Sequence, residues 1–263
     1  MLSISSAIRL LPGYFKYFFE AVDDHSLHSP YVFDLYQGVF KTHPDARRLA
    51  VVEQIRGQYL KNITKLDTSN PGAGSVKRGD IRKVSDIARI SGSGDKTCRL
   101  LDALVRYFKP LNIVELGTSL GLGTMCLAGR SDSRVYTFEA NDSIADLAGA
   151  NFKMAGFKNI DLIRGPIDQT LPVFISRQST IDMAFIDANH TEEALLRYFE
   201  WLLPLMSLGG LLVVDDIRWS PGMYSGWKQL AQRKDVALSL DLMQIGLLVF
   251  IPDFLKAHYY LEY

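Results

Sequence analysis

The stretch from Asn112 to Thr124 constrains the fold more than any other part of the chain. It reads Asn-Ile-Val-Glu-Leu-Gly-Thr-Ser-Leu-Gly-Leu-Gly-Thr. The apolar run at its start is rich in strand formers and too short for a helix, so it predicts a buried strand. Three glycines follow, Gly117, Gly121 and Gly123. Glycine permits positive φ and close approach of a ligand, so we expect a glycine-rich turn that leads into a helix N-terminus at the edge of a sheet.

Strand-like and helix-like segments alternate after this turn. Strands are expected over residues 134–140, 160–165, 181–188 and 210–217, with helices over 143–155, 169–176, 192–206 and 222–232. Such alternation specifies a mostly parallel sheet with helices on both faces. Residues 236–242 and 246–251 are separated by only Met-Gln-Ile, which is too short for a helical crossover, so we expect an antiparallel hairpin at this end of the sheet.

We therefore predict an α/β fold with a doubly wound, mostly parallel seven-stranded sheet whose last strand is antiparallel, plus a helical N-terminal extension. The first 111 residues are expected to be helical and irregular, without a parallel strand, and to contain helices over residues 8–22, 31–40 and 50–63. The predicted domains are residues 1–95 and 96–263. A turn-rich loop over residues 67–75 is expected to be either a linker or a segment that closes over substrate.

The composition bounds the class of protein. Lys plus Arg and Asp plus Glu both number 29, so nothing favours a nucleic-acid partner, and no apolar run reaches membrane-spanning length. Two cysteines are too few for a disulfide framework, so we expect a cytoplasmic protein. The aromatic-rich segment 11–19 is expected to pack on the main domain or on a second subunit, which leaves a homodimer open.

The glycine spacing differs from the dinucleotide fingerprint G-x-G-x-x-G, and Glu115 lies two residues before the first glycine. The stretch resembles the first motif of class I S-adenosylmethionine-dependent methyltransferases, in the form found in catechol and caffeoyl-CoA O-methyltransferases. The resemblance implies S-adenosylmethionine as cofactor, with its methionine end wrapped by the turn residues Glu115, Gly117, Thr118, Ser119 and Gly121. A carboxylate here would attract the cationic cofactor and repel a pyrophosphate. An ordinary βα turn is the alternative.

Two further strand ends carry candidate cofactor residues. Glu139 ends the second strand, 22 residues after Gly117, where a carboxylate can accept hydrogen bonds from both ribose hydroxyls. The third strand is followed by a segment that resembles the family's adenine-binding turn. There the resemblance implies an apolar contact from Ile167 and an acceptor for the adenine amino group at Asp168.

Carboxylates also follow the next two strands. Asp187 comes after Met-Ala-Phe-Ile, and Asp215 and Asp216 come after Leu-Leu-Val-Val. Adjacent strand ends converge, and three carboxylates repel one another unless a cation lies among them, so we expect a divalent metal, Mg²⁺ or else Mn²⁺ or Ca²⁺. Asp216 departs from the asparagine of the catechol-type enzymes and is similar to the Asp-Asp form of other small-molecule O-methyltransferases. As an alternative, Asp216 caps a helix or faces solvent.

His190 stands three residues after Asp187, where the catechol-type enzymes have a lysine. The resemblance implies a catalytic centre with Asp187, which also belongs to the cofactor site, and with His190 as the base. An imidazole can take a proton from a metal-acidified hydroxyl, although His190 could instead cap the helix that begins near Glu192. A further set of residues is expected either to line the substrate site or to belong to the core: Trp219, Tyr224, Trp227 and Asp241.

Together these patterns predict a magnesium-assisted O-methyltransferase that acts on a hydroxyl of a small molecule. Three alternatives stay open. The first is a metal-independent methyltransferase that acts on nitrogen or on RNA. The second is an NAD-linked oxidoreductase, and the third is a non-catalytic nucleotide-binding module.

Overall fold

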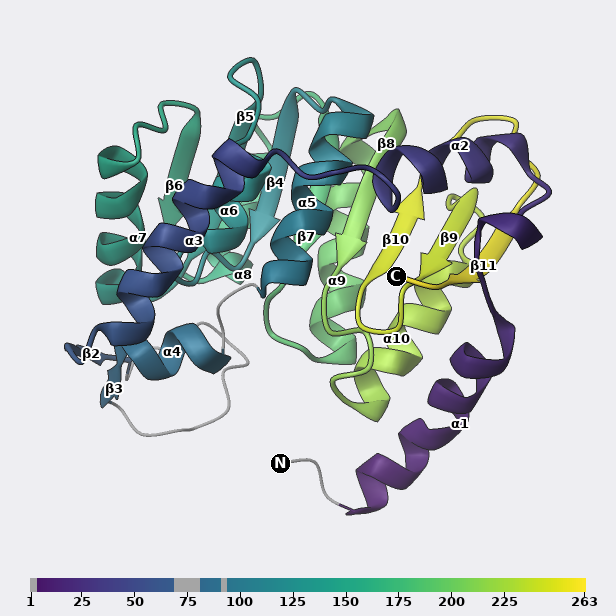
Figure 1. The fold of residues 1–263 in the computed structure, drawn as a ribbon, viewed down its shortest axis with the longest axis horizontal. Helices are drawn as coiled ribbons and strands as arrows, with labels where there is room; N and C mark the ends of the chain where they lie inside the picture. The colour runs from purple at the N-terminus through teal and green to yellow at the C-terminus, as the bar shows by residue number, and fades with distance from the viewer. Residues whose placement is uncertain (1–3, 69–80, 91–93) are drawn as a thin grey trace. The chain divides into compact units, whose positions relative to one another are not determined.

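The computed structural model describes residues 4–68, 81–90 and 94–263 (Figure 1). The chain divides into two compact units, one formed by Gly38–Arg177 and the other by Met1–Gln37 with Gln178–Tyr263. Neither boundary falls at the predicted junction after residue 95, so the predicted division into an extension and a domain stays a prediction. The predicted loop over residues 67–75 lies outside the described residues from position 69 onward.

The unit Gly38–Arg177 contains a parallel sheet with the strand order β4-β5-β6. Its strands are β4 (Asn112–Leu116), β5 (Arg134–Glu139) and β6 (Ile160–Arg164). Its helices are α3 (Ala46–Lys61), α4 (Val84–Ile90), α5 (Asp95–Phe108), α6 (Leu122–Leu127), α7 (Asp142–Met154) and α8 (Ile167–Ile175). A separate antiparallel pair is formed by β2 (Lys65–Asp67) and β3 (Ile81–Lys83). The predicted alternation is confirmed here, and the apolar side chains of β4 are fully buried, as a strand covered on both faces requires.

The other unit contains strands in the order β1-β11-β9-β10-β8-β7 (Figure 1). These are β1 (Ala21–Val22), β7 (Ile181–Ile186), β8 (Met206–Val214), β9 (Leu238–Asp241), β10 (Gly246–Val249) and β11 (Ala257–Leu261). Its helices are α1 (Ile4–Glu20), α2 (Pro30–Val39), α9 (Glu192–Leu202) and α10 (Pro221–Gln232), with the 3₁₀ turns η1 (Asp24–Ser26) and η2 (Leu203–Leu205). Strands β7 and β8 are parallel, whereas β10 runs antiparallel to both β8 and β9. The predicted hairpin is therefore confirmed.

The pairing of β1 with β11 corrects the expectation that the N-terminal region has no parallel strand. Ala21 pairs with Tyr260 and Val22 with Leu261, in parallel register. The Tyr17 hydroxyl donates to the Leu261 carbonyl oxygen at 2.8 Å and so fastens the end of α1 to β11. A two-residue strand carries no periodicity, which is why sequence patterns do not reveal it. With β1 and β11, the described strands number more than the seven that were predicted. The predicted α/β class is confirmed. Among the described helices, none is long and apolar enough to cross a membrane.

A buried ion pair between Arg218 and Asp241 joins distant parts of this unit. The guanidinium donates from Nη1 to Asp241 Oδ1 at 2.7 Å and from Nη2 to Oδ2 at 2.9 Å, and both side chains are at most 2% exposed. Nη2 also donates to the Gly13 carbonyl oxygen in α1 at 3.3 Å. The Trp227 indole donates to Asp241 Oδ2 at 3.3 Å. One ion pair thus ties α1 and α10 to β9.

Removal of Asp241 is expected to destabilise the fold strongly. In Asp241→Ala the Arg218 charge stays buried without its partner, which costs about 3–5 kcal/mol. The matched control is Asp235→Ala, because Asp235 pairs with Arg233 at 3.0 Å but is 49% exposed, and exposed pairs contribute about 1 kcal/mol or less. Urea unfolding of both variants measures the difference, and equal losses would contradict the importance of the buried pair.

Candidate active site

The glycine-rich turn follows β4 and takes up a left-handed backbone. The φ angles are 106° at Gly117, 48° at Ser119 and 79° at Gly121. Gly123 instead lies within α6, which corrects the expectation that it shares the special conformation. The predicted turn and helix N-terminus are present. They rest on β5, because the backbone N–H groups of Gly117 and Thr118 donate to the Phe138 carbonyl oxygen.

Glu139 binds the turn to the end of β5. Its Oε2 accepts from the Ser119 backbone N–H and its Oε1 from that of Asn141, each at 2.9 Å. Burial raises the pKa of Glu139, while the backbone N–H donors act in the opposite direction. A carboxylate offers about four lone-pair sites, so these two bonds leave capacity for ribose hydroxyls. The ribose role of Glu139 stays a prediction.

Glu115 lies beneath the turn, at 1% exposure. Its Oε2 accepts from the Thr124 hydroxyl at 2.5 Å and from the Thr137 hydroxyl at 2.6 Å. The Thr118 hydroxyl lies 2.6 Å from that of Thr137, so a chain of hydroxyls connects the turn to the buried carboxyl. Burial raises the pKa of Glu115 to about 7, and the threonine hydroxyls partly offset the effect. The expected attraction of a cationic ligand by Glu115 remains a prediction.

Tyr59 in α3 supports the same turn from a region that the sequence left without a role. Its hydroxyl donates to the Leu120 carbonyl oxygen at 2.9 Å and accepts from Asn151 Nδ2. The ring is 3% exposed, and burial raises the pKa of Tyr59 to about 12. The sequence gives one hint, since Tyr59 continues the buried face of α3 at helical spacing from Ile55. Helical spacing predicts that Tyr59 is buried, but it does not reveal that the Tyr59 hydroxyl contacts the glycine-rich turn.

Ile167 and Asp168 form the first turn of α8, directly after β6. The preceding Gly165 has φ of 118°, a conformation that glycine adopts readily. The predicted turn therefore exists at the expected strand end. The contacts proposed for adenine stay predictions.

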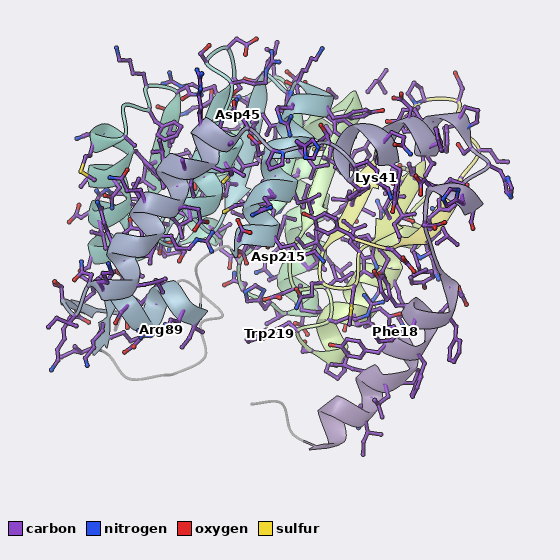
Figure 2. The ribbon with its side chains drawn as sticks, viewed as in Figure 1. Phe18, Lys41, Asp45, Arg89, Asp215 and Trp219 are labelled. Atoms are coloured by element: carbon purple, nitrogen blue, oxygen red, sulfur yellow. The ribbon has the colours of Figure 1, made fainter. Side chains whose placement is uncertain are left out.

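Carboxylates meet at the ends of β7 and β8. Asp187 follows β7, and Asp215 and Asp216 follow β8, its parallel neighbour. The Asp215 backbone N–H donates to the Ile186 carbonyl oxygen at 3.0 Å, so the two strand ends adjoin as expected (Figure 2 labels Asp215). Burial, with the charge of Asp216, raises the pKa of Asp215 to about 7. Burial also raises the pKa of Asp216, whereas the interaction with His190 lowers it.

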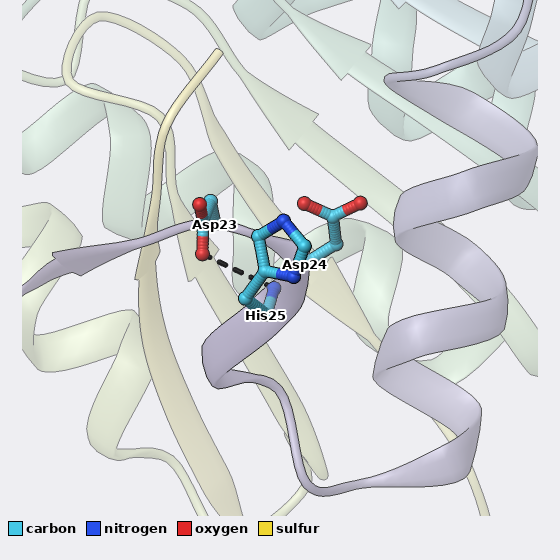
Figure 3. Close-up of side chains that lie close together, drawn as sticks. All are labelled: Asp23, Asp24 and His25. Atoms are coloured by element: carbon cyan, nitrogen blue, oxygen red, sulfur yellow. Dashed lines mark hydrogen bonds between the residues drawn. The ribbon is translucent and has the colours of Figure 1, made fainter.

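The three aspartates do not form a compact ligand set. Within the described ranges, the one group of three acidic, histidine or cysteine residues whose ligand atoms all lie within 4.8 Å is Asp23, Asp24 and His25 (Figure 3). Protein contacts account for that group, because Asp23 accepts from the His25 backbone N–H at 3.1 Å and Asp24 accepts from Gln37 Nε2 at 2.9 Å. A cation at the strand ends would require the oxygens of Asp187, Asp215 and Asp216 to draw closer together.

His190 stands beside these carboxylates. Its Nε2 lies 3.7 Å from Asp187 Oδ1, and its buried Nδ1 has no hydrogen-bond partner in the protein. Burial lowers the pKa of His190, and Asp216 acts in the opposite direction, so the neutral imidazole is favoured. The cap of α9 is Thr191, whose hydroxyl accepts from the Ala194 backbone N–H at 3.2 Å. His190 is therefore not that cap.

The backbone around this cluster is strained. Asn189, His190 and Asp216 have φ of 63°, 31° and 52°, values that residues other than glycine seldom adopt. The Asn189 side chain donates to the Tyr198 hydroxyl in α9, which holds the loop in place. Such strain persists where the surrounding structure fixes it, often at functional sites.

Trp219 is the exposed member of the predicted substrate wall. It is 46% exposed, its ring centroid lies 5.5 Å from that of His190, and its backbone N–H donates to the Asp216 carbonyl oxygen at 2.8 Å. Asp241 and Trp227 are at most 1% exposed, and Tyr224 is 9% exposed. Those three belong to the core, so one of the four wall candidates faces solvent.

Gly121→Ala is expected to disrupt the turn. A Cβ at Gly121 would lie 2.6 Å from Cζ of the buried Phe152, and φ at this position is +79°. The matched control is Gly156→Ala, which has the same φ of +79° and nothing within 4 Å of the added atom. Both variants lose roughly 1–2 kcal/mol to left-handed strain, and Gly121→Ala loses about 1–3 kcal/mol more to overpacking. Urea unfolding measures the stability of both variants. An equal loss would show that the Phe152 ring moves aside at little cost in free energy.

Glu115 is expected to make stability depend on pH. Its pKa is about 7 in the folded chain against an ordinary value of 4.5, so the stability contributed by the neutral carboxyl is lost as the pH rises from 4.5 through about 7. The loss is on the order of 3–4 kcal/mol, since one pKa unit corresponds to about 1.4 kcal/mol. Glu115→Gln cannot ionise, so its stability relative to the wild type should rise across this window. The free energy of unfolding of the wild type and of Glu115→Gln, measured at several pH values, tests this expectation. The same dependence on pH in both proteins would contradict it.

Comparison with known proteins agrees with this arrangement. A family model described as a methyltransferase domain matches residues 114–217. The catechol O-methyltransferase of Mycobacterium tuberculosis is 28% identical over 148 residues, 55% of this chain and 64% of the relative. The caffeoyl-CoA O-methyltransferase of Stellaria longipes is 25% identical over 190 residues, 69% of this chain and 76% of the relative. The chain thus spans just under two thirds of the Mycobacterium tuberculosis enzyme.

Solved structures share the fold. The O-methyltransferase from Bacillus cereus, in complex with SAH (S-adenosylhomocysteine), has a TM-score of 0.54 and 22% identity, with 83% of this chain and 97% of that chain covered. The resemblance stated from the sequence is therefore confirmed, including the mostly parallel α/β sheet with its antiparallel strand. The chain is therefore similar to the class I S-adenosylmethionine-dependent methyltransferases and, among them, to the O-methyltransferases.

Proposed function

We propose that this chain transfers the methyl group of S-adenosylmethionine to a hydroxyl of a small molecule. The observation that carries the proposal is the cluster of His190, Asp187 and Asp216, in which a buried imidazole nitrogen without a protein partner lies beside carboxylates at strand ends. The relatives support the substrate class, because they are catechol and caffeoyl-CoA O-methyltransferases.

The residues that we propose for cofactor binding, apart from Asp187, belong to the unit Gly38–Arg177. Gly117, Thr118, Ser119 and Gly121 would surround the methionine end, and Glu139 would accept the ribose hydroxyls through its remaining lone pairs. Ile167 and Asp168 would contact adenine. When bound, S-adenosylmethionine supplies a methyl group on a positively charged sulfur.

Chemically, the strand-end carboxylates suit a divalent cation. Asp187, Asp215 and Asp216 offer the hard oxygen ligands that Mg²⁺ prefers. Burial, and after it the charge of Asp216, raises the pKa of Asp215, and a cation would offset both effects. A bound cation lowers the pKa of a coordinated hydroxyl and orients it. The three side chains would have to close on the ion, since their oxygens are not gathered within 4.8 Å.

His190 would act as the base. In the proposed transfer the hydroxyl oxygen would take the methyl group from sulfur, which would keep the bonding pair, and Nδ1 of His190 would receive the hydroxyl proton. This nitrogen is buried and lacks a protein donor, and the lowered pKa keeps the imidazole neutral and able to accept a proton. The exposed ring of Trp219 would border the acceptor.

A metal-independent transfer is the second candidate, because the open arrangement of the three aspartates favours it. The neutral overall charge supports a small-molecule acceptor over a nucleic acid. Cys98 and Cys126 are buried and unbridged, which supports a reducing, cytoplasmic setting for the reaction.

Calorimetry and a methyl-transfer assay test these assignments together. We expect S-adenosylhomocysteine to bind and NAD not to bind, and we expect a panel of catechols and other small hydroxyl compounds to include an acceptor of labelled methyl. Chelation with EDTA and Asp215→Asn should each lower turnover at least about tenfold, because the hydroxyl loses metal activation. Asp253→Asn, an exposed aspartate, is the matched control.

Different failures exclude different parts of the proposal. Full turnover in EDTA and in Asp215→Asn would exclude the metal and favour the second candidate. Absence of S-adenosylhomocysteine binding would contradict the cofactor, and binding without transfer to any acceptor would favour a non-catalytic module. His190→Gln should lower kcat by about 10²–10⁴ with little effect on cofactor binding, and an unchanged kcat would exclude His190 as the base.

A further inference from the structure

The glycine-rich turn over residues 117–121 holds an unfavourable backbone conformation. Gly117, Ser119 and Gly121 all have positive φ, which a serine seldom adopts. Leu120 lies between the last two, and its side chain is 1% exposed. A backbone of this kind persists only where the surrounding contacts determine it. The contacts that reach the turn therefore decide whether its conformation is present before a ligand binds.

The Leu120 carbonyl oxygen is one point at which the turn is held. Helix α6 begins after its N-cap Gly121, whose carbonyl oxygen accepts from the Met125 backbone N–H at 3.0 Å. Because the N-cap carbonyl is the first acceptor of a helix, the carbonyl of Leu120 lies outside the hydrogen bonds of α6. A buried carbonyl needs a donor from elsewhere, and here the Tyr59 hydroxyl provides it at 2.9 Å.

The hydrogen bonds that lead to Leu120 run in one direction. Asn151 donates from Nδ2 to the Leu147 carbonyl oxygen at 3.0 Å and to the Tyr59 hydroxyl at 2.5 Å. An amide turned over would place its oxygen against the Leu147 carbonyl, with no hydrogen between two acceptors. The phenol therefore accepts from Asn151 and gives its single hydrogen to Leu120. Tyr59 and Asn151 are 3% and 8% exposed, so both bonds are largely shielded from water.

Helix α3 holds the Tyr59 ring in a fixed place beside α6 (Figure 1). Near the start of α3, the Arg48 guanidinium donates to the buried Asp102 of α5 at 2.7 Å. At the other end, the Asn62 carbonyl oxygen accepts from the Ser85 backbone N–H at 2.9 Å. A donor carried by a helix that is fixed at both ends is placed more accurately than one on a loop.

Helix α7 contacts the turn a second time through the residue after Asn151. A Cβ at Gly121 would lie 2.4 Å from Cε1 of Phe152, so this ring lies against the backbone of the turn. One segment of α7 thus packs on Gly121 and orients the Tyr59 hydroxyl. Helices α3 and α7 together hold the turn from two sides of the sequence, one before it and one after it.

We propose that Tyr59 and Asn151 are positioning residues for S-adenosylmethionine, which act by holding residues 117–121 in the conformation that binds the methionine end of the cofactor. The inference rests on the proposed function, which assigns this turn to the cofactor. When only one conformation of a protein binds, the apparent Kd is the intrinsic Kd divided by the fraction of molecules in that conformation. Loss of the contact should therefore weaken cofactor binding and leave kcat at saturating cofactor unchanged.

The Tyr59 hydroxyl keeps its hydrogen at neutral pH. Burial raises the pKa of Tyr59 to about 12, and the hydrogen bond from Asn151 acts in the opposite direction. The phenol therefore stays neutral and able to donate to Leu120. The contribution of this contact to cofactor affinity should not change near pH 7, whereas Glu115, with a pKa of about 7, changes its charge there.

Calorimetry with S-adenosylhomocysteine tests the role of Tyr59. Tyr59→Phe removes the hydroxyl and keeps the ring, and it should raise Kd about tenfold, which corresponds to one buried hydrogen bond. The matched control is Tyr17→Phe, because the Tyr17 hydroxyl also donates to a backbone carbonyl, that of Leu261 at 2.8 Å, and Tyr17 is 7% exposed. Tyr17→Phe should bind as the wild type does. Urea unfolding establishes that each variant is folded under the conditions of binding.

A double-mutant cycle tests whether Asn151 acts through Tyr59. Asn151→Leu alone should raise Kd by a smaller factor than Tyr59→Phe, because the phenol can still donate to Leu120. In the Tyr59→Phe background, Asn151→Leu should change Kd little, since the hydroxyl through which it acts is gone. Factors that simply multiply would overturn the role given to Asn151.

Hydrogen exchange of the ligand-free chain reports on the turn directly. Peptides that cover residues 117–123 should exchange faster in Tyr59→Phe than in the wild type and in Tyr17→Phe, whereas peptides from α5 should not change. In the methyl-transfer assay, KM for S-adenosylmethionine should rise about as much as Kd, and kcat should stay unchanged.

The outcomes separate this inference from the proposed function. A wild type that binds S-adenosylhomocysteine, with the same Kd in Tyr59→Phe, would overturn the inference alone. Equal weakening in Tyr59→Phe and Tyr17→Phe would overturn it as well, because the effect would then be one of general stability. A wild type that does not bind S-adenosylhomocysteine would contradict the proposed function and, with it, this inference.

Discussion

The buried ion pair of Arg218 and Asp241 is the interaction on which the unit Met1–Gln37 with Gln178–Tyr263 depends. A guanidinium and a carboxylate taken out of water are tolerated only if most donors and acceptors are matched, and here Nε of Arg218 is the one guanidinium nitrogen without a partner among the described residues. The match comes from distant segments: the Gly13 carbonyl oxygen of α1, the Trp227 indole of α10 and the Met243 carbonyl oxygen, which accepts from Arg218 Nη1 at 2.6 Å. Asp215 and Asp216 lie two to three residues before Arg218, so the proposed metal ligands and the ion pair belong to one loop.

The unit Gly38–Arg177 also buries a carboxyl group, and there hydroxyl groups donate the hydrogen bonds. Glu115 is buried without a cationic partner, and the hydroxyls of Thr124 and Thr137 provide its hydrogen bonds. The chain of hydroxyls continues to Thr118 in the glycine-rich turn, while Tyr59 holds the Leu120 carbonyl oxygen from the other end of that turn. The conformation of the turn is therefore set by polar contacts beneath it as much as by its glycines. Cofactor binding would add to a turn that is already ordered.

Much of this arrangement can be predicted from sequence because it depends on local pattern. The alternation of strand-like and helix-like segments predicts the parallel strands, and a three-residue connection predicts the β9–β10 hairpin. Apolar runs that end in aspartate predict that Asp187 and Asp215 lie at adjoining strand ends. Contacts between residues far apart in the chain leave no such pattern. The two-residue strand β1, the hydroxyl of Tyr59 and the partner of Arg218 belong to this class. Trp219 and Trp227 could not be separated either, because the burial of Trp227 depends on how α10 packs on the core and the exposure of Trp219 on the loop that precedes α10.

Burial is the main cause of the pKa of about 7 at both Glu115 and Asp215, but the lesser contributions differ, and this difference bears on where a cation would bind. At Glu115 burial is the main cause, and hydroxyl donors already stabilise the ionised form. At Asp215 the neighbouring charge of Asp216 adds to the burial, so like-charge repulsion remains to be relieved. A divalent cation relieves repulsion between two carboxylates at once, whereas at Glu115 it would have to displace satisfied hydrogen bonds. The ends of β7 and β8 are therefore the favoured place for a metal, even though their oxygens must first draw together.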